Sequence, residues 1–237
     1  MIALDFSKAF DSVRHYSLVN KFANFTLPDY LHNWIVDNLS GRQHQTKIGC
    51  EISSMLSINA SIIQGSALGP VEYVFTASDL CTLYPSNTLI KYADDTYLLV
   101  PSNNTHLIPQ ELKYISLWAS ENNLKLNDVK SQEMIVFQPH KRRQFVCPAT
   151  IPGINRVDKI NILGVTVSNT LSLNHHITAV VEKCSRSLYA LKTIQAHGLA
   201  GNALLDIARA TLVAQLLYAS PAWWGFLKAD EKIGFSQ

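Results

Sequence analysis

The sequence lacks the features that mark several common functional classes. Its four cysteines stand alone with no C-x-x-C pair, which excludes a zinc ribbon or a thioredoxin-type redox motif; they are Cys50, Cys81, Cys147 and Cys184. Such widely spaced cysteines are typical of buried, reduced thiols. Proline and glycine, at 9 and 10 of 237 residues, are too scarce for a collagen-like or linker-dominated chain.

Secretion and membrane signals are also missing. The first residues carry no basic region ahead of an apolar core, so we expect no signal peptide. The most apolar stretch, 203–219, contains Asp206, Arg209 and Gln215, whereas a membrane span needs about 20 nearly uncharged residues. We therefore predict a buried helix there, no membrane partner, and an intracellular protein, cytoplasmic or nuclear, that is not secreted.

Charge is low but unevenly distributed. Hydrophobic residues make up 47% and charged residues 16%, enough apolar material to exclude a disordered chain. Residues 1–124 carry 7 basic and 11 acidic side chains, and residues 125–192, which include the basic loop His140–Arg143, carry 10 and 4. This order favours a cation site followed by a surface that faces a polyanion. An ordinary solvated surface with uneven lysines is the alternative.

Hydrophobic periodicity predicts a mixed chain up to about residue 168 and only helices beyond it. Strands are expected at 2–6, 46–49, 56–59, 89–92, 96–100, 133–137 and 160–167. Helices are expected at 18–25, 28–39, 71–80, 107–124, 177–194 and 203–219.

Three carboxylates stand where strands end. Asp94 and Asp95 separate two short strand patterns, which predicts a β-hairpin with both aspartates at its tip. Asp5 closes a different strand. Three such carboxylates suit two divalent cations about 3.5–4 Å apart, an arrangement used for in-line phosphoryl transfer. Mg²⁺ prefers oxygen ligands of this kind. An Asp-Asp dipeptide alone is weak support, because it is common in turns.

Five blocks occur in a fixed order along the chain. They are Asp5-Phe-Ser-Lys-Ala-Phe-Asp11, Gln64-Gly-Ser-Ala-Leu-Gly-Pro70, Tyr92-Ala-Asp-Asp95, Leu126-Asn-Asp-Val-Lys-Ser131 and Ile162-Leu-Gly-Val165. In this order they resemble the reverse transcriptase family, most closely the type carried by non-LTR (LINE-like) retrotransposons. The likeness covers residues 1–167 and continues more loosely to about residue 225.

The resemblance implies an α+β fold. Residues 1–167 would form a polymerase palm, an antiparallel sheet with helices on one face, and residues 168–237 a helical, thumb-like region. The implied activity is RNA-directed DNA polymerisation, in which deoxynucleoside triphosphates extend a DNA primer along an RNA template. The oligomeric state is left open.

The same resemblance assigns residues to the site. Asp5, Asp94 and Asp95 match the catalytic carboxylates, which would hold two Mg²⁺ ions, with Mn²⁺ as an alternative, and the carbonyl of Phe6 would add a ligand. Phe10 matches an aromatic wall that excludes a ribose 2′-hydroxyl; core packing at the turn is the alternative, and the two are compatible.

Four further positions match the family's substrate-binding residues. Gln64 and Gly65 match the loop beside the incoming nucleotide and template, where a plain turn is the alternative. Lys130 matches a lysine near the triphosphate, with a solvated lysine as the alternative. Tyr92 would support the hairpin or touch the primer end, with packing on the strand as the alternative. In the later helix at 177–194, basic residues would follow the nucleic-acid backbone; they are Lys183, Arg186 and Lys192.

The chain also departs from the family pattern. Ile63 replaces the usual proline before Gln64, and Val71-Glu72-Tyr73 replaces a hydrophobic start of the following helix. Only four residues precede Asp5, so we expect a partial copy that lacks the fingers. A catalytically inactive or domesticated remnant, at most a nucleic-acid-binding module, is therefore the alternative to an active polymerase.

Overall fold

The computed structural model describes residues 1–138 and 147–226, and contacts divide the chain into two compact units. The first, here the sheet unit, comprises Met1–Glu133 and Pro148–Arg156. The second, here the helical unit, comprises Met134–Cys147 and Val157–Gln237. Residues 157–167 thus pack with the later helices, although the sequence groups them with the palm. The basic loop His140–Arg143 lies outside the described residues.

The sheet unit is built on a five-stranded sheet with the order β11-β10-β1-β8-β7. Its strands are β1 (Ile2–Leu4), β7 (Thr88–Tyr92), β8 (Asp95–Leu99), β10 (Gln132–Glu133) and β11 (Asn155–Arg156). All neighbours are antiparallel except β10 and β11, which are parallel. A separate antiparallel pair joins β2 (Phe6–Ser7) to β9 (Lys125–Leu126). The predicted strand at 133–137 is much shorter than its pattern indicated.

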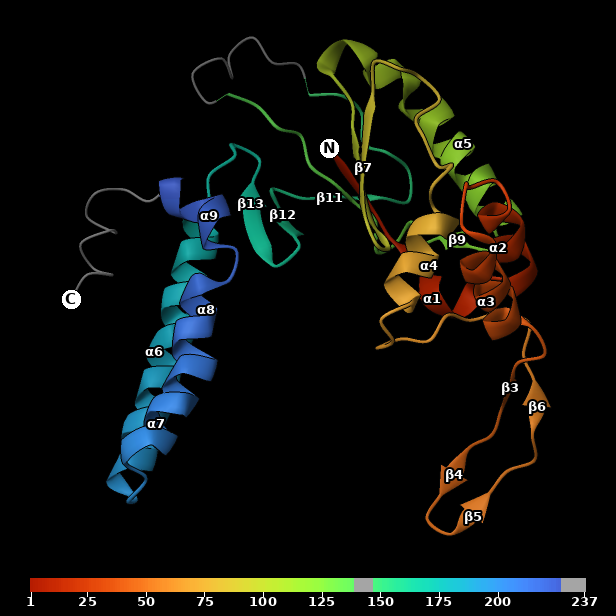
Figure 1. Ribbon diagram of the computed structural model, residues 1–237. Coiled ribbons are helices and arrows are strands. Elements are labelled where there is room, and N and C mark those ends of the chain that lie inside the picture. Colours follow the sequence, from red (N-terminus) through yellow and green to blue (C-terminus); the bar gives the residue numbers. More distant parts are fainter. Residues whose placement is uncertain (139–146, 227–237) are drawn as a thin grey trace. The chain divides into compact units, whose positions relative to one another are not determined.

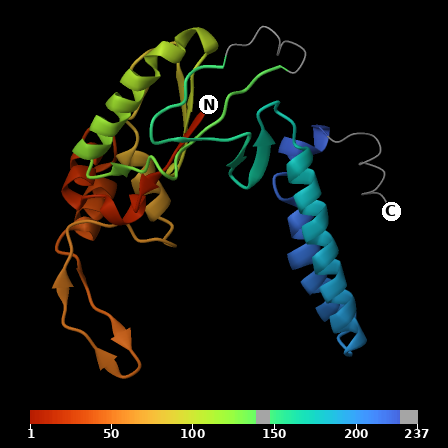
Figure 2. The ribbon, with the colours of Figure 1, turned by 180° about the vertical axis from the view of Figure 1, so that it is seen from behind.

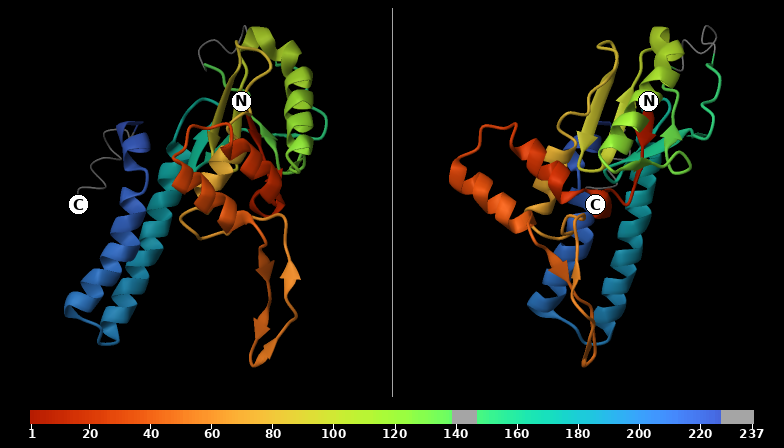
Figure 3. Two further views of the ribbon diagram at one scale, coloured as in Figure 1. Left: turned by 45° about the vertical axis from the view of Figure 1, so that its right-hand side comes forward. Right: turned by 90° about the vertical axis from the view of Figure 1, so that its right-hand side faces the viewer.

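Helices cover this sheet through a shared core. They are α1 (Ala9–Ser12), α2 (His15–Phe22), α3 (Asp29–Leu39), α4 (Gly69–Thr76), the 3₁₀ turn η1 (Ser102–Leu107) and α5 (Ile108–Glu121). Ile2 and Leu4 are two residues apart on β1 and therefore point to the same face of the sheet. They belong to the same buried cluster as Ile115 of α5 and Phe22 of α2. Helix α5 runs beside the β7–β8 hairpin in every view (Figure 3). The predicted α+β palm is therefore confirmed.

A long hairpin arm extends away from helices α2 and α3 (Figure 1). It consists of two short ladders, β3 (Gln43–His44) with β6 (Leu56–Ser57) and β4 (Lys47–Ile48) with β5 (Glu51–Ile52). Apolar side chains along it, including Ile48, Ile52 and Met55, are exposed.

The helical unit contains a β-hairpin of its own. Strands β12 (Lys159–Ile162) and β13 (Val165–Ser168) replace the single strand expected at 160–167. The chain turns at Leu163 and Gly164, whose φ angles of 47° and 86° are both left-handed. Leucine rarely adopts this conformation, so the sequence gives little sign of the turn.

Helix α6 (Asn174–Ala196) follows and lies side by side with the next helical stretch (Figure 2). That stretch runs through α7 (Gly201–Ala208), the π-helical segment η3 (Arg209–Val213) and α8 (Ala214–Leu217). The last described elements are α9 (Ser220–Trp223) and η4 (Trp224–Phe226). Trp223 is buried and forms a small core with Val165, Leu173 and Ile177.

Two expectations about burial are wrong. The apolar stretch 203–219 is helical but contains no buried residue, and Leu205 and Leu217 are exposed. Among the described helices, α6 is the one that packs along this stretch. By length and composition alone, Gly201–Phe226 could also cross a membrane, with a mean hydropathy of 1.2. The second error concerns the thiols, because only Cys184 is buried and the other three cysteines are exposed.

Candidate active site

Strand register brings Asp5 to the tip of the β7–β8 hairpin. Leu4 of β1 pairs with Thr96 of β8. Asp5 follows Leu4 in the chain and Asp95 precedes Thr96, so both aspartates come next beyond this pair. Because the strands are antiparallel, both aspartates lie at the same edge of the sheet. The convergence of two distant blocks is therefore a direct result of β1–β8 pairing.

The hairpin turn contains Ala93 and Asp94. Ala93 has a left-handed φ of 51°, and Tyr92 pairs with Asp95 to close the turn. Burial, then the charges of Asp94 and Asp5, raise the pKa of Asp95 above its ordinary value. Asp95 thus lies close enough to Asp94 and Asp5 to be repelled by their charges.

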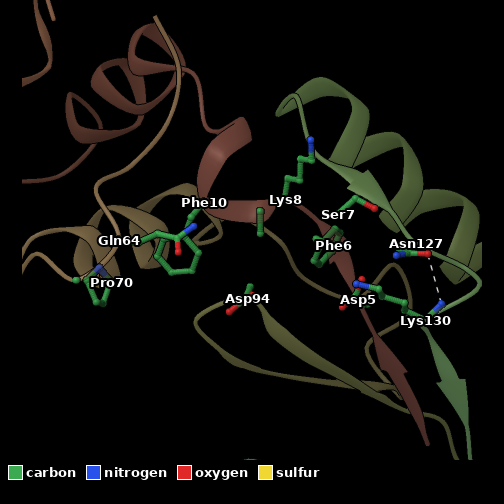
Figure 4. Close-up of a pocket in the computed structure, with 12 residues that line it drawn as sticks. Asp5, Phe6, Ser7, Lys8, Phe10, Gln64, Pro70, Asp94, Asn127 and Lys130 are labelled. Atoms are coloured by element: carbon green, nitrogen blue, oxygen red, sulfur yellow. Dashed lines mark hydrogen bonds between the residues drawn. The ribbon is translucent and has the colours of Figure 1, made fainter. Parts of the chain in front are cut away.

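Asp5 and Asp94 line one open cavity of about 680 Å³ (Figure 4). The rest of its lining joins the first two sequence blocks to the fourth and consists of Phe6, Ser7, Lys8, Ala9, Phe10, Gln64, Gly65, Pro70, Asn127 and Lys130. One wall is anionic, from Asp5 and Asp94, and Lys8 and Lys130 add cationic groups. Asp95 and Tyr92, by contrast, lie outside this lining at the last pair of the hairpin.

Phe10 forms an aromatic wall of the cavity. Its ring stacks on Tyr73 of α4, with centroids 5.0 Å apart and an interplanar angle of 20°. Tyr73 is 1% exposed, and burial and then Asp94 raise the pKa of its hydroxyl. Phe10 is half-buried against the core while facing the cavity, so packing and lining are combined in one side chain.

The Gln64–Gly65 loop lies beside Phe10 (Figure 4). The Gln64 amide donates to the Asp11 carboxylate at 3.3 Å, which links the second sequence block to the first. Gly65 has a φ of 81°, and an added Cβ would meet nothing within 4 Å. Glycine is therefore favoured here by the left-handed backbone conformation.

The basic residues expected along nucleic acid belong to the helical unit. Lys183, Arg186 and Lys192 are all exposed on α6. Lys183 also lines a cavity of about 510 Å³ between α6 and the η3–α8 stretch.

The donors of the cavity suit a hard divalent cation. Asp5 and Asp94 offer carboxylates, Asn127 an amide oxygen and Phe6 a backbone carbonyl, and the repulsion felt by Asp95 would be relieved by a cation. Mg²⁺ is often held by one or two carboxylates together with water and substrate phosphates. Within residues 1–138 and 147–226, however, no three histidine, cysteine, aspartate or glutamate side chains converge as a finished metal site.

Two residues at this site were not selected individually from the sequence. The Ser131 hydroxyl accepts a hydrogen bond from the Asp5 backbone N–H at 3.1 Å, and the Asn127 N–H donates to the Asp5 carbonyl at 2.8 Å. Both belong to the fourth block, more than 120 residues after Asp5. Sequence reasoning selected Lys130 between them but not the residues that hold Asp5.

Comparison with known proteins gives consistent matches. Residues 1–167 match the family model described as reverse transcriptase (RNA-dependent DNA polymerase). Over 191 residues the chain is 30% identical to the RNA-directed DNA polymerase from mobile element jockey of Drosophila melanogaster, covering 75% of this chain and 20% of that protein. The probable RNA-directed DNA polymerase from transposon X-element of the same species is 28% identical over 185 residues, with the same coverage. The chain thus spans about a fifth of the length of these relatives.

Among solved structures, a telomerase from Candida tropicalis in complex with a TWJ fragment of telomeric RNA aligns with a TM-score of 0.50. The alignment covers 93% of this chain and 39% of that one at 12% identity, so it supports the fold alone. The family model covers most of the chain and agrees with the mobile-element relatives. The chain belongs to the reverse transcriptase (RNA-dependent DNA polymerase) family and carries a reverse transcriptase domain of the non-LTR retrotransposon type.

Proposed function

We propose that this chain supplies the catalytic palm of an RNA-directed DNA polymerase that extends a DNA primer with deoxynucleotides on an RNA template. The single observation that carries the proposal is the shared cavity, which joins Asp5 and Asp94 to Phe10, Gln64 and Lys130. Members of this family generally use divalent ions, and we propose two Mg²⁺ ions, with Mn²⁺ as a substitute. When bound, the ions would activate the primer 3′-hydroxyl and stabilise the leaving pyrophosphate.

Each side chain then has a defined task. Asp5 and Asp94 hold the cations, with the Phe6 carbonyl as a further donor and Asp95 adding negative charge from the neighbouring strand position. Phe10 blocks a ribose 2′-hydroxyl by occupying its space. Gln64 and Gly65 lie beside the nucleotide and template, and Tyr92, 66% exposed at the hairpin, is placed for the primer end. Lys130 offsets the negative charge of the pyrophosphate as it leaves the α-phosphorus.

One observation favours a second candidate, a remnant that binds nucleic acid without catalysis. No three metal-ligating side chains converge in the part of the chain that the structure describes. An incomplete set of metal ligands is what a remnant without catalysis would show.

Primer extension on an RNA template with Mg²⁺ separates the two candidates. The assay compares this chain, a version extended at its N-terminus, Asp94→Asn and the matched control Asp37→Asn, an exposed position on α3. The polymerase proposal predicts extension that Asp94→Asn abolishes and Asp37→Asn preserves. Absence of extension by both wild-type versions would leave the remnant, and extension by Asp94→Asn would refute the site assignment.

A further inference from the structure

The backbone of Asp5 lies at a break between two sheets. Leu4 pairs with Thr96 in the five-stranded sheet, whereas Phe6 pairs with Leu126 of β9 in a separate ladder. Asp5 belongs to neither strand, so its N–H and C=O have no ladder partners. Polar backbone groups in such a position need other partners, because leaving them unpaired destabilises the fold.

One short turn satisfies both groups. The Asn127 N–H donates to the Asp5 carbonyl at 2.8 Å, and the Asp5 N–H donates to the Ser131 hydroxyl at 3.1 Å. The Ser131 hydroxyl donates in turn to the Asn127 carbonyl at 2.8 Å, and the Ser131 N–H donates to the same carbonyl at 2.9 Å. The result is a closed loop of hydrogen bonds around the Asp5 backbone.

The chemistry of this loop depends on a hydroxyl. Ser131 accepts from Asp5 and donates to Asn127, and among small side chains only a hydroxyl does both without charge. Ser131 is 0% exposed, so water cannot readily replace the missing oxygen in an alanine variant.

The turn also carries two lining residues of the active-site cavity. Asn127 and Lys130 both line it, and Lys130 immediately precedes Ser131. The Lys130 N–H donates to the Asn127 side chain at 3.4 Å, as drawn in Figure 4. The same turn therefore bonds to the backbone from which an anionic side chain at Asp5 and a cationic one at Lys130 project.

We infer that Ser131 is a positioning residue, which fixes the carboxylate of Asp5 for the cation and holds it in register with Lys130. This inference rests on the proposed function, since it takes Asp5 as a cation ligand. Outer residues that orient ligands typically contribute 10- to 100-fold to metal affinity or activity. Removing the Ser131 hydroxyl should therefore weaken Mn²⁺ binding by roughly 10-fold or more.

The test compares wild type, Ser131→Ala, Ser131→Thr and Thr76→Val in the full chain. Thr76 is a matched control, because its buried hydroxyl donates to the Glu72 carbonyl at 2.9 Å on α4, away from the cavity lining. Three quantities are measured: hydrogen exchange at the Asp5 amide, the Mn²⁺ dissociation constant by electron paramagnetic resonance, and the KM and kcat of primer extension. Thermal melting reports any general loss of stability.

Ser131→Ala should expose the Asp5 amide to exchange, raise the Mn²⁺ dissociation constant and lower kcat, while Thr76→Val changes melting alone. Ser131→Thr keeps the hydroxyl and should restore Mn²⁺ affinity even if its extra methyl lowers the melting temperature.

Unchanged amide exchange and Mn²⁺ affinity in Ser131→Ala would overturn the inference. If wild type neither binds Mn²⁺ nor extends a primer, the proposed function fails, and the inference, which takes Asp5 as a cation ligand, is overturned with it. Faster exchange at Asp5 would then show only that Ser131 stabilises the backbone.

Discussion

Phe10 and Tyr73 stack almost face to face, so the proposed sugar-selecting ring is held by a buried aromatic of α4. Replacing Phe10 with valine would open space for a 2′-hydroxyl. We expect the preference for deoxynucleotides over ribonucleotides to fall by roughly 10- to 200-fold, as measured by competing primer extension.

Tyr73→Leu tests the support behind that ring. An aromatic pair contributes about 0.5–1.5 kcal/mol beyond its buried area, so discrimination should fall by several-fold while Phe10 itself remains. Phe75→Leu is the control, since the Phe75 ring packs on Phe22 with centroids 4.2 Å apart and does not line the cavity. Equal discrimination in the Tyr73 and Phe75 variants would show that stacking does not govern sugar selection.

Lys130→Ala should slow the polymerase step by neutralising less charge on the leaving group. We expect a loss on the order of 10- to 100-fold in kcat, with a smaller change in primer binding. Lys125→Ala provides the comparison, because Lys125 is exposed on β9 outside the cavity lining. Single-turnover nucleotide addition separates the rate of the chemical step from primer binding. An unchanged kcat would contradict the assignment of Lys130 to the site.

Glu72 predicts an unusual pH dependence of stability. Its side chain is 2% exposed with Oε1 unpartnered, and burial, opposed by Arg42, raises its pKa above the ordinary 4.5. A raised pKa means that the folded state favours the protonated acid. The contribution of Glu72 to stability is therefore greatest below pH 4.5 and is lost as pH rises through the higher value. Glu72→Gln should therefore stabilise the protein at pH 7 by about 1–2 kcal/mol, with the gain vanishing in acid.

Urea unfolding across pH measures this effect. Glu51→Gln, on the exposed arm, should show no such trend. A Glu72 variant that is less stable than wild type at pH 7 would mean that the carboxylate has a stabilising partner.

Replacing Glu111, by contrast, should destabilise the protein. It is 0% exposed, and its carboxylate accepts from the N–H groups of Leu83 and Tyr84 and from the Asn87 amide at 2.8–3.0 Å. Glu111→Leu leaves these donors unpaired and should destabilise the sheet unit by about 3 kcal/mol in urea unfolding. Glu121→Leu, exposed at the end of the same helix, should change stability by less than about 0.5 kcal/mol.

The three cations of α6 predict salt-sensitive binding of nucleic acid. Changing Lys183, Arg186 and Lys192 to glutamine should reduce affinity with little sequence preference. The slope of log affinity against log salt should flatten by about 2–3, since each phosphate contact contributes about 0.7–0.9. Filter binding over a range of salt concentrations measures the slope, and an unchanged slope would contradict the assignment of this surface.

Local patterns predicted the parts of the site that depend on strand ends. The hairpin at Asp94 and the strand before Asp5 are short-range features, and antiparallel pairing was enough to bring them together. Ser131 was missed because its bond to Asp5 joins residues 126 positions apart, and a serine has no periodicity to reveal it. The turn at Leu163 was missed for a related reason, because leucine gives no turn signal and the apolar pattern continues through it.

Burial was the least predictable property. The stretch 203–219 is apolar enough for a core, but burial depends on which elements pack against it, and that is not encoded in its own pattern. The same holds for Cys50, Cys81 and Cys147, whose spacing says nothing about solvent access.

The return of the chain to the sheet unit after residue 147 limits how this protein can be shortened. Glu133 is 1% exposed and bonds to Arg156 of β11 at 2.7 Å. A fragment that stops after β10 would keep the Glu133 carboxylate in the interior. It would lose the Arg156 guanidinium that neutralises this carboxylate, together with the edge strand β11. Trimming to the catalytic blocks alone would therefore yield a polypeptide prone to misfolding, and Glu133→Gln would be the natural repair.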